Sequence, residues 1–122
     1  MDYITVFKAL SDKTRVRMLH LMLQAKKELC ICEIMDALSL AQYNVSKHIR
    51  ELKLSGLTSE RKEGRFVFYS LVRQKTIFHR TIIEAVRALP ADNFAQDNKR
   101  LRRRLSLRKN GRCIVPIRNH SL

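Results

Sequence analysis

The sequence predicts a mainly α-helical fold that carries one β-hairpin, in the order of a winged helix-turn-helix, assembled as a homodimer. Apolar residues recur at helical spacing over about residues 3–55. The period then changes to alternation over 57–71, with a turn signal in the middle, and helical spacing returns over about 74–107. Four helices, a hairpin and two further helices give this fold class.

The first two predicted helices are short and amphipathic. Apolar side chains at helical spacing place the first helix over residues 2–9. Ser11 or Asp12 can cap the second helix, because a short side-chain oxygen accepts hydrogen bonds from the free backbone N–H groups of the first turn. This helix ends near Ala25, where two lysines follow.

The third and fourth helices form the predicted helix-turn-helix. The third covers about Cys30–Leu38 and the fourth Ala41–Ser55, with only Ser39-Leu40 between them. Gly56 ends the fourth helix, since glycine readily adopts the left-handed conformation that follows many helices.

The wing and the last two helices follow. Leu57–Lys62 and Arg65–Leu71 alternate as strands, and Glu63-Gly64 between them is a hairpin-type turn. A helix over about Gln74–Leu89 ends at Pro90, and a last helix covers about Asn93–Leu107. We therefore expect a DNA-binding domain over 1–92, followed by a C-terminal helix and a basic, cysteine-containing tail over 93–122.

The outer elements suggest dimerisation. Residues 2–9 and 74–107 are apolar on one side, and so small a core leaves them little to cover within one chain. A two-fold interface is the expected use of these faces.

The charge favours a polyanionic partner. The net charge is +14, of which residues 1–98 contribute 16 − 11 = +5 and residues 99–122 contribute nine basic and no acidic side chains. Such a surplus favours nucleic acid. No run of about 18 apolar residues and no signal-peptide layout occur, so we expect a cytoplasmic protein that does not span a membrane. Phosphate-cradling loops and nucleophile–base motifs are missing, so we do not expect an enzyme.

The fourth helix and the wing carry the candidate DNA contacts. Glutamine and asparagine can pair with adenine and lysine with guanine, whereas serine and histidine can reach phosphate, and basic wing residues suit the minor groove or backbone. The alternative is a solvated polar face. The candidates are Gln42, Tyr43, Asn44, Ser46, Lys47 and His48 on the helix, and Arg61, Lys62 and Arg65 on the wing.

Cys30 and Cys32 are the candidate ligand-binding thiols. On an ideal helix they would lie about 200° apart, so binding one ion would require the first turn to unwind or distort. A helix N-terminus lowers a thiol pKa, which would favour the thiolate. Soft thiolates select soft centres. The alternative is that Cys30 is a surface residue and Cys32 a core residue.

The chain resembles the ArsR/SmtB family of metal- and metalloid-responsive repressors over about residues 4–72. The resemblance rests on five segments taken together. They are Phe7–Asp12 with Thr14-Arg15, Glu28–Ile34 (ELCICEI), Val45–Leu52 (VSKHIREL), Gly56-Leu57, and Arg61–Arg65 with Tyr69–Leu71.

Two departures from the family pattern bear on the ligand. Arsenic sensors of the family often carry a third cysteine three residues after the second, where this chain has Met35. The zinc site that the family builds on the helix after the wing uses an aspartate and two histidines, and this helix offers only His79 and Glu84. We interpret that zinc site as absent.

The resemblance implies a repressor that binds trivalent arsenic, or antimony, and then releases an inverted-repeat operator in double-stranded DNA. Because trivalent arsenic prefers three sulfur ligands in such sensors, Cys113 is the candidate third thiol, from the same chain or its partner. Arg112 beside it would favour its thiolate. A free thiol on the tail is the competing interpretation. We expect no permanently bound cofactor, only arsenite as inducer. A thiol redox switch, a sensor of cadmium, lead or zinc, and a ligand-free nucleic-acid-binding module remain alternatives.

Overall fold

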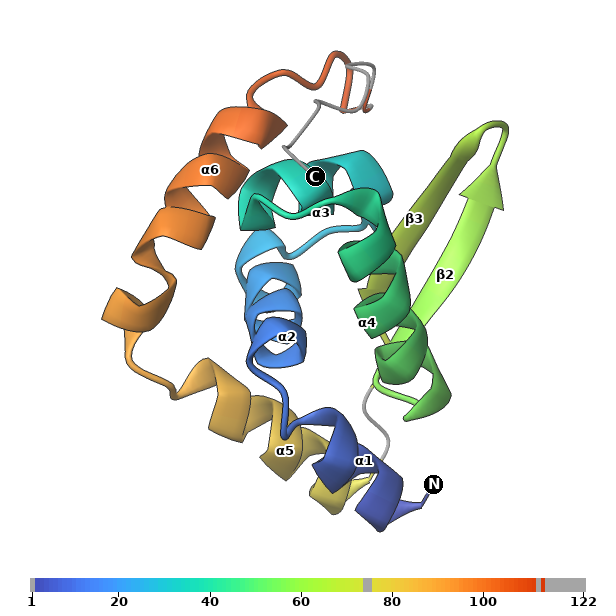
Figure 1. Ribbon diagram of the computed structural model, residues 1–122, viewed down its shortest axis with the longest axis vertical. Coiled ribbons are helices and arrows are strands. Elements are labelled where there is room, and N and C mark those ends of the chain that lie inside the picture. The colour runs from blue at the N-terminus through green and yellow to red at the C-terminus, as the bar shows by residue number, and fades with distance from the viewer. Residues whose placement is uncertain (1, 74–75, 112, 114–122) are drawn as a thin grey trace.

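The computed structural model describes residues 2–73, 76–111 and 113. Its helices pack together, and a β-hairpin extends along one side of them (Figure 1); with one further short strand the sheet has three strands. The elements are α1 (Tyr3–Ala9), α2 (Lys13–Ala25), β1 (Leu29–Cys30), α3 (Ile31–Leu38), α4 (Gln42–Leu54), β2 (Thr58–Glu63), β3 (Phe66–Leu71), α5 (Ile77–Arg87), the 3₁₀ turn η1 (Ala91–Phe94) and α6 (Ala95–Leu105).

The helix-turn-helix and the wing form as the sequence predicts. Asp12 caps α2, with its Oδ1 accepting from the Arg15 N–H at 3.1 Å. Gly56 after α4 has φ +84°, in the left-handed region that suits glycine. β2 and β3 pair antiparallel, with Glu63 opposite Phe66 at the turn. The winged helix-turn-helix prediction is therefore confirmed.

One strand was not expected. Leu29 and Cys30 form β1, which pairs with Tyr69 and Phe68 of β3, so the sheet has the order β1-β3-β2. The predicted helix over Cys30–Leu38 therefore begins one residue later, and Cys30 is its extended N-cap residue, with φ −79° and ψ 162°. The register of β1 fixes one thiol beside the middle of β3.

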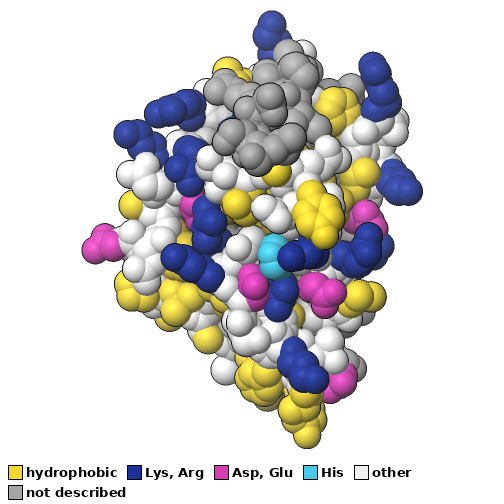
Figure 2. All heavy atoms as spheres, in the orientation of Figure 1, with side chains coloured by type: hydrophobic (Ala, Val, Ile, Leu, Met, Phe, Trp, Pro, Cys, Tyr) yellow, Lys and Arg dark blue, Asp and Glu magenta, His cyan; other side chains and the backbone are white. Residues whose placement is uncertain are grey.

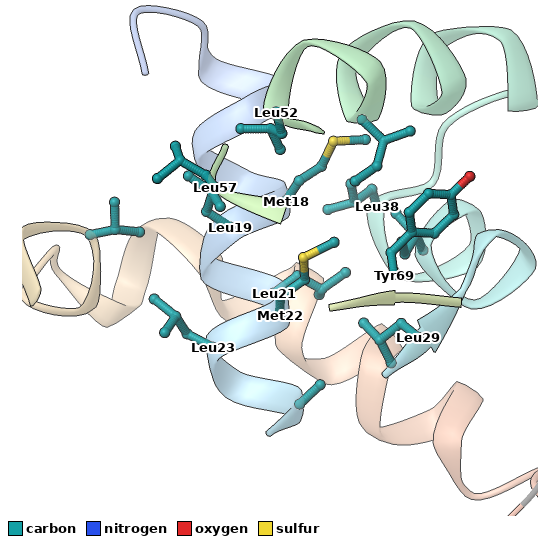
Figure 3. Packing of buried hydrophobic residues seen from close by; sticks show 14 of the residues in the cluster. Met18, Leu19, Leu21, Met22, Leu23, Leu29, Leu38, Leu52, Leu57 and Tyr69 are labelled. Carbon is teal, nitrogen blue, oxygen red and sulfur yellow. The ribbon is translucent and has the colours of Figure 1, made fainter. Parts of the chain in front are cut away.

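The core lies around α2, which the other elements enclose. Leu and Met side chains of α2 meet residues from the sheet, α3 and α4 (Figure 3). Burial of this much aliphatic surface is the main driving force for folding, at about 25 cal/mol per Å². The labelled residues are Met18, Leu19, Leu21, Met22, Leu23, Leu29, Leu38, Leu52, Leu57 and Tyr69.

The last predicted helix divides in two, and it does not project outward. η1 precedes α6, and α6 packs on α3 and α2. Arg17 of α2 donates to both Asp97 oxygens at 2.8 and 2.9 Å, and the Arg100 Nε donates to the Ala37 carbonyl at 2.8 Å. The apolar side of α6 is therefore covered within the chain, contrary to the expectation that it has little to cover there, and a dimer interface over 74–107 stays a prediction. The division into 1–92 and 93–122 stays a prediction.

Exposed apolar side chains remain on α1 and α5. Tyr3, Ile4 and Phe7 of α1 and Ile77 of α5 are 48–74% exposed. Phe7 meets Phe78 of α5 edge-on, with ring centroids 5.7 Å apart. The two helices therefore present one apolar surface, which we call the α1/α5 face. Residues 74 and 75 of the predicted helix Gln74–Leu89 lie outside the described residues.

No helix among the described residues is long and apolar enough to cross a membrane.

Candidate functional site

Three buried thiols meet at the start of α3. The Cys30 Sγ lies 2.8 Å from the Sγ of Cys32 and 2.8 Å from that of Cys113, and the last two sulfurs are 3.3 Å apart. The three side chains are between 0% and 5% exposed. Of the described His, Cys, Asp and Glu side chains, these three form a group able to hold an ion. We call this group the thiol cluster.

The geometry excludes one alternative for the pair and corrects one expectation. Cys30 is not a surface residue, and the first turn of α3 need not unwind, because Cys30 precedes the helix with extended backbone angles. An extended residue followed by a helical one brings Sγ atoms two positions apart onto the same side. The 200° argument fails because it assumed that Cys30 was helical.

The cluster contacts the wing sheet through Phe68. Phe68 of β3 packs against the thiols, and its backbone is paired with that of Cys30. The Arg61 guanidinium lies 5.0 Å from the centroid of the Phe68 ring, within the range of a cation–π contact. The thiols therefore touch both α3 and the wing sheet.

Two arginines near the cluster were not among the predicted site residues. Arg108 donates to both Glu33 oxygens at 2.6 Å, and to the Glu28 carbonyl at 2.8 Å. Arg104 of α6 is 3% exposed, pairs with Asp36 at 2.9 Å and lies 4.0 Å from the Cys113 Sγ. The basic run Lys99–Arg104 therefore includes one buried arginine, Arg104. The i, i+4 spacing of Arg100, Arg104 and Arg108 was the available signal.

The thiol pKa values diverge. The hydrogen bond from Cys30 lowers the pKa of Cys32 to about 6, and Cys113 and the Arg104 charge act in the same direction. The hydrogen bond to Cys32 raises the pKa of Cys30, and burial adds to this rise. Burial raises the pKa of Cys113 to about 11. The expectation of lowered thiol pKa values therefore holds for Cys32 alone, and Arg112 lies outside the described residues.

The candidate DNA contacts fall into two groups. Gln42, Tyr43, Asn44 and Lys47 are exposed along α4, and Ser46 is half-buried. His48 instead turns inward, with its Nδ1 3.2 Å from an Arg15 nitrogen and 3.7 Å from Asp12. Arg50 is exposed on α4 and was not among the candidates.

The wing candidates also differ from one another. Arg61 is held by Glu28 and Glu63, with nitrogen–oxygen distances of 2.8 and 3.0 Å. Lys62 and Arg65 are exposed and make no ion pair with the described residues. Only these two wing residues are thus available to DNA without a rearrangement.

Comparison with known proteins decides the family. The description "Bacterial regulatory protein, arsR family" matches residues 12–59, which cover the helix-turn-helix and the start of the wing. The solved structure of HlyU from Vibrio cholerae N16961 is 30% identical and has a TM-score of 0.61. The match covers 71% of this chain and 89% of that one. The chain belongs to the arsR family. The family is one of regulatory proteins rather than enzymes, and the matched residues are those of its helix-turn-helix.

Curated relatives carry metal-resistance names. A cadmium resistance transcriptional regulatory protein, the CadC homolog of Staphylococcus aureus, is 44% identical over 71 residues, which are 58% of each chain. The arsenic resistance transcriptional regulator ArsR1 of Pseudomonas putida is 42% identical over 66 residues, which are 54% of this chain and 51% of that one. The match thus spans about half the length of these relatives. It supports a metal-responsive repressor without choosing the metal.

Proposed function

We propose that the protein is a homodimeric repressor that binds trivalent arsenic, or antimony, through Cys30, Cys32 and Cys113, and then releases its operator. The observation that carries the proposal is the thiol cluster, in which three sulfur atoms lie within 4.8 Å of one another. Linkage requires that the inducer bind the DNA-free conformation more tightly than the DNA-bound one.

Burial supports a trivalent ligand. Three thiolates on a trivalent centre form a neutral complex, whereas three on a divalent ion leave one negative charge. That charge would have to be held at a site whose thiols are at most 5% exposed, and burying an uncompensated charge is costly. The neighbouring ion pairs, Arg108–Glu33 and Arg104–Asp36, are balanced in themselves. The free cluster already carries one negative charge near neutral pH, because the pKa of Cys32 is lowered to about 6. A trivalent ligand removes this buried charge whereas a divalent ion keeps it, so cadmium, lead and zinc are the less favoured ligands.

The exposed side chains of α4 and the wing would make the DNA contacts. Gln42, Asn44 and Lys47 suit base edges, with Tyr43 and Ser46 beside them. Lys62 and Arg65 suit the backbone next to the wing. His48 and Arg61 would have to exchange their present partners first. The α1/α5 face would join two chains, so that two α4 helices reach the half-sites of an inverted repeat.

The deciding experiment titrates fully reduced protein with arsenite while DNA binding is followed by fluorescence anisotropy. The duplex is first selected from a random-sequence pool. We expect arsenite to release the wild type and not the Cys30→Ser/Cys32→Ser variant, which should bind the duplex as tightly as wild type. Release of that variant by arsenite would contradict the proposal. Cadmium(II) in a parallel titration tests the divalent alternative.

A redox switch is the second candidate, because the Cys30 and Cys113 sulfurs are already 2.8 Å apart. A peroxide would oxidise two thiols to a disulfide and be reduced to water or an alcohol. Release by peroxide, together with no response to arsenite under reduction, would favour this candidate.

A further inference from the structure

The basic side chains of α6 divide into an inward and an outward set. Arg100 contacts Asp97 and the Ala37 carbonyl, Arg104 contacts Asp36, and Arg108, just after the helix, contacts Glu33. Each inward arginine therefore has a carboxylate partner from this chain. The inward set serves the packing of α6 on α3.

The outward set has no such partner. Lys99, Arg102 and Arg103 are exposed and make no ion pair with the part of the chain that the structure describes. At about 100° per residue they share an arc of roughly 100° on the helix. Like charges at spacings of three and four residues repel one another, so this face gains nothing from the fold itself. We call these three residues the outward face of α6.

Within α6 itself, acidic residues do not offset this charge. α6 contains one acidic residue, Asp97, which is 5% exposed and already engaged by Arg17 and Arg100. Residues 99–122 contain nine basic and no acidic side chains. A polyanion is therefore the partner that complements the outward face.

The outward face is on α6, which α3 separates from α4, the helix that carries most of the candidate DNA contacts. α3 contacts both α4 and α6, and it lies between them in Figure 1. In the same orientation, Figure 2 shows dark blue side chains along the side of the molecule where α6 runs, and others on the wing side. Basic groups thus occur on both sides of α4. Duplex DNA read by α4 has phosphates to either side of the groove that the helix enters.

We propose that the outward face of α6 contacts the phosphate backbone of duplex DNA next to the segment read by α4. This inference rests on the proposed operator binding. Phosphate contacts carry no sequence information, but each releases counterions and so makes binding more salt-dependent. The outward face would extend the footprint on the side of α4 opposite the wing. Its role would be to raise affinity for operators that have long flanks.

The experiment compares two duplexes, one trimmed to the selected operator and one extended by flanks on both sides. Binding constants are measured across salt concentrations for wild type, Lys99→Gln/Arg103→Gln, and the control Arg80→Gln/Arg87→Gln. The control removes the same charge from exposed residues of α5. Glutamine keeps helix propensity close to that of the basic residues.

We expect wild type to bind the extended duplex more tightly and with a steeper salt slope. The α6 variant should lose that difference, with the slope on the extended duplex falling by about 0.9 for each phosphate contact removed. The control should behave as wild type, with light scattering confirming the same oligomeric state. The trimmed duplex should be bound alike by all three proteins.

Several outcomes would overturn the inference. One is that the α6 variant retains the full flank dependence and salt slope of wild type. Another is that this variant and the control lose affinity equally, as a net-charge effect would require. A loss confined to single-stranded RNA would assign the face to another partner. Failure of wild type to select any duplex would instead contradict the proposed function, so the two failures are distinguishable. Circular dichroism melts separate loss of helix stability from loss of a DNA contact.

Discussion

Arg108 and Glu33 form a doubly hydrogen-bonded ion pair that joins the segment after α6 to the start of α3. Both nitrogen–oxygen distances are 2.6 Å, and Glu33 is 1% exposed. The Glu33 Oε1 also accepts the Cys30 N–H at 3.0 Å. One carboxylate thus orients the backbone of Cys30 and fixes the arginine five residues before Cys113.

Changing Arg108 should therefore detach the third thiol. In Glu33→Gln/Arg108→Gln no buried charge is left uncompensated, but the shorter glutamine side chain at position 108 cannot span the distance that Arg108 does. Arg108→Gln alone leaves Glu33 uncompensated, at a cost of about 3–5 kcal/mol of folding stability. We expect arsenic bound to the double variant to have two sulfur neighbours by X-ray absorption, against three in wild type. Arg103→Gln, on the outward face of α6, is the control. Three sulfur neighbours in a folded double variant would show that the pair does not position Cys113.

Cys113 itself should set the arsenite concentration needed for release. Cys113→Ser keeps the size of the side chain but loses the soft ligand. We expect two sulfur neighbours and a half-release point raised at least about tenfold, which corresponds to about 1.4 kcal/mol of lost binding. An unchanged coordination number together with an unchanged half-release point would mean that Cys113 takes no part.

The pH dependence should distinguish arsenite from divalent metals. Because the pKa of Cys32 is lowered to about 6 and that of Cys113 is raised to about 11, one thiolate and two thiols face the ligand near neutral pH. When neutral arsenite, As(OH)₃, binds, its three hydroxyl groups leave as three waters. This needs three protons, of which the two thiols supply two, so binding takes up one proton from solution. Its affinity should fall about tenfold per pH unit above pH 6 and level off below.

The affinity for a divalent ion should depend on pH in the opposite direction. Binding to one thiolate and two thiols expels two protons, so affinity should rise by about a hundredfold per pH unit in the same range. Isothermal titration in buffers of different ionisation enthalpy counts the protons directly. Proton release on arsenite binding would contradict the assignment of one thiolate and two thiols to the free protein.

The sequence predicted the architecture well because its signals are local. The Asp12 cap, the Gly56 stop and the Glu63-Gly64 turn each act within a few residues, and each marks an element boundary in the structure. The thiol cluster could be predicted as a set of residues but not as a geometry. Its shape depends on the pairing of Cys30 with Phe68, a long-range contact that no local pattern announces. A two-residue strand also carries too little alternation to detect.

The burial of Arg104 could not be predicted from the sequence for a related reason. Periodicity indicates which side of α6 is apolar. It does not indicate that α3 supplies acidic side chains to the basic residues that border this apolar side. Arg104 is buried because Asp36 of α3 faces it, at a sequence separation of 68 residues. A basic residue near an apolar stripe can therefore be solvated or paired, and the tertiary partner decides which.

The α1/α5 face should hold the dimer. Phe7 is 51% exposed in the single chain, and we expect Phe7→Glu to place a charge in the interface and weaken dimerisation by about 2–4 kcal/mol. Leu54→Glu, at a 68% exposed position of α4, is the matched control. Analytical ultracentrifugation should show a monomer for the first variant at concentrations where the control remains dimeric. Equal dimerisation of both variants would exclude this face.

Glu28 should restrain the wing in the absence of DNA. Its carboxylate accepts from the Nε and a terminal nitrogen of Arg61, at 2.8 to 3.2 Å, and Glu28 stands two residues before Cys30. The exposed pair itself contributes little to stability. Its effect is on availability, because Arg61 cannot meet a phosphate while Glu28 holds it.

We therefore expect Glu28→Gln to tighten operator binding a few-fold and to steepen the salt slope by about 0.9 per freed arginine. Arg61→Gln should then change affinity less in the wild-type background than in the Glu28→Gln background, and a double-mutant cycle measures that coupling. Lys62→Gln is the control, since Lys62 makes no ion pair with the described residues and should weaken binding equally in both backgrounds. If Arg61→Gln has the same effect with and without Glu28, the ion pair does not limit access of the wing to DNA.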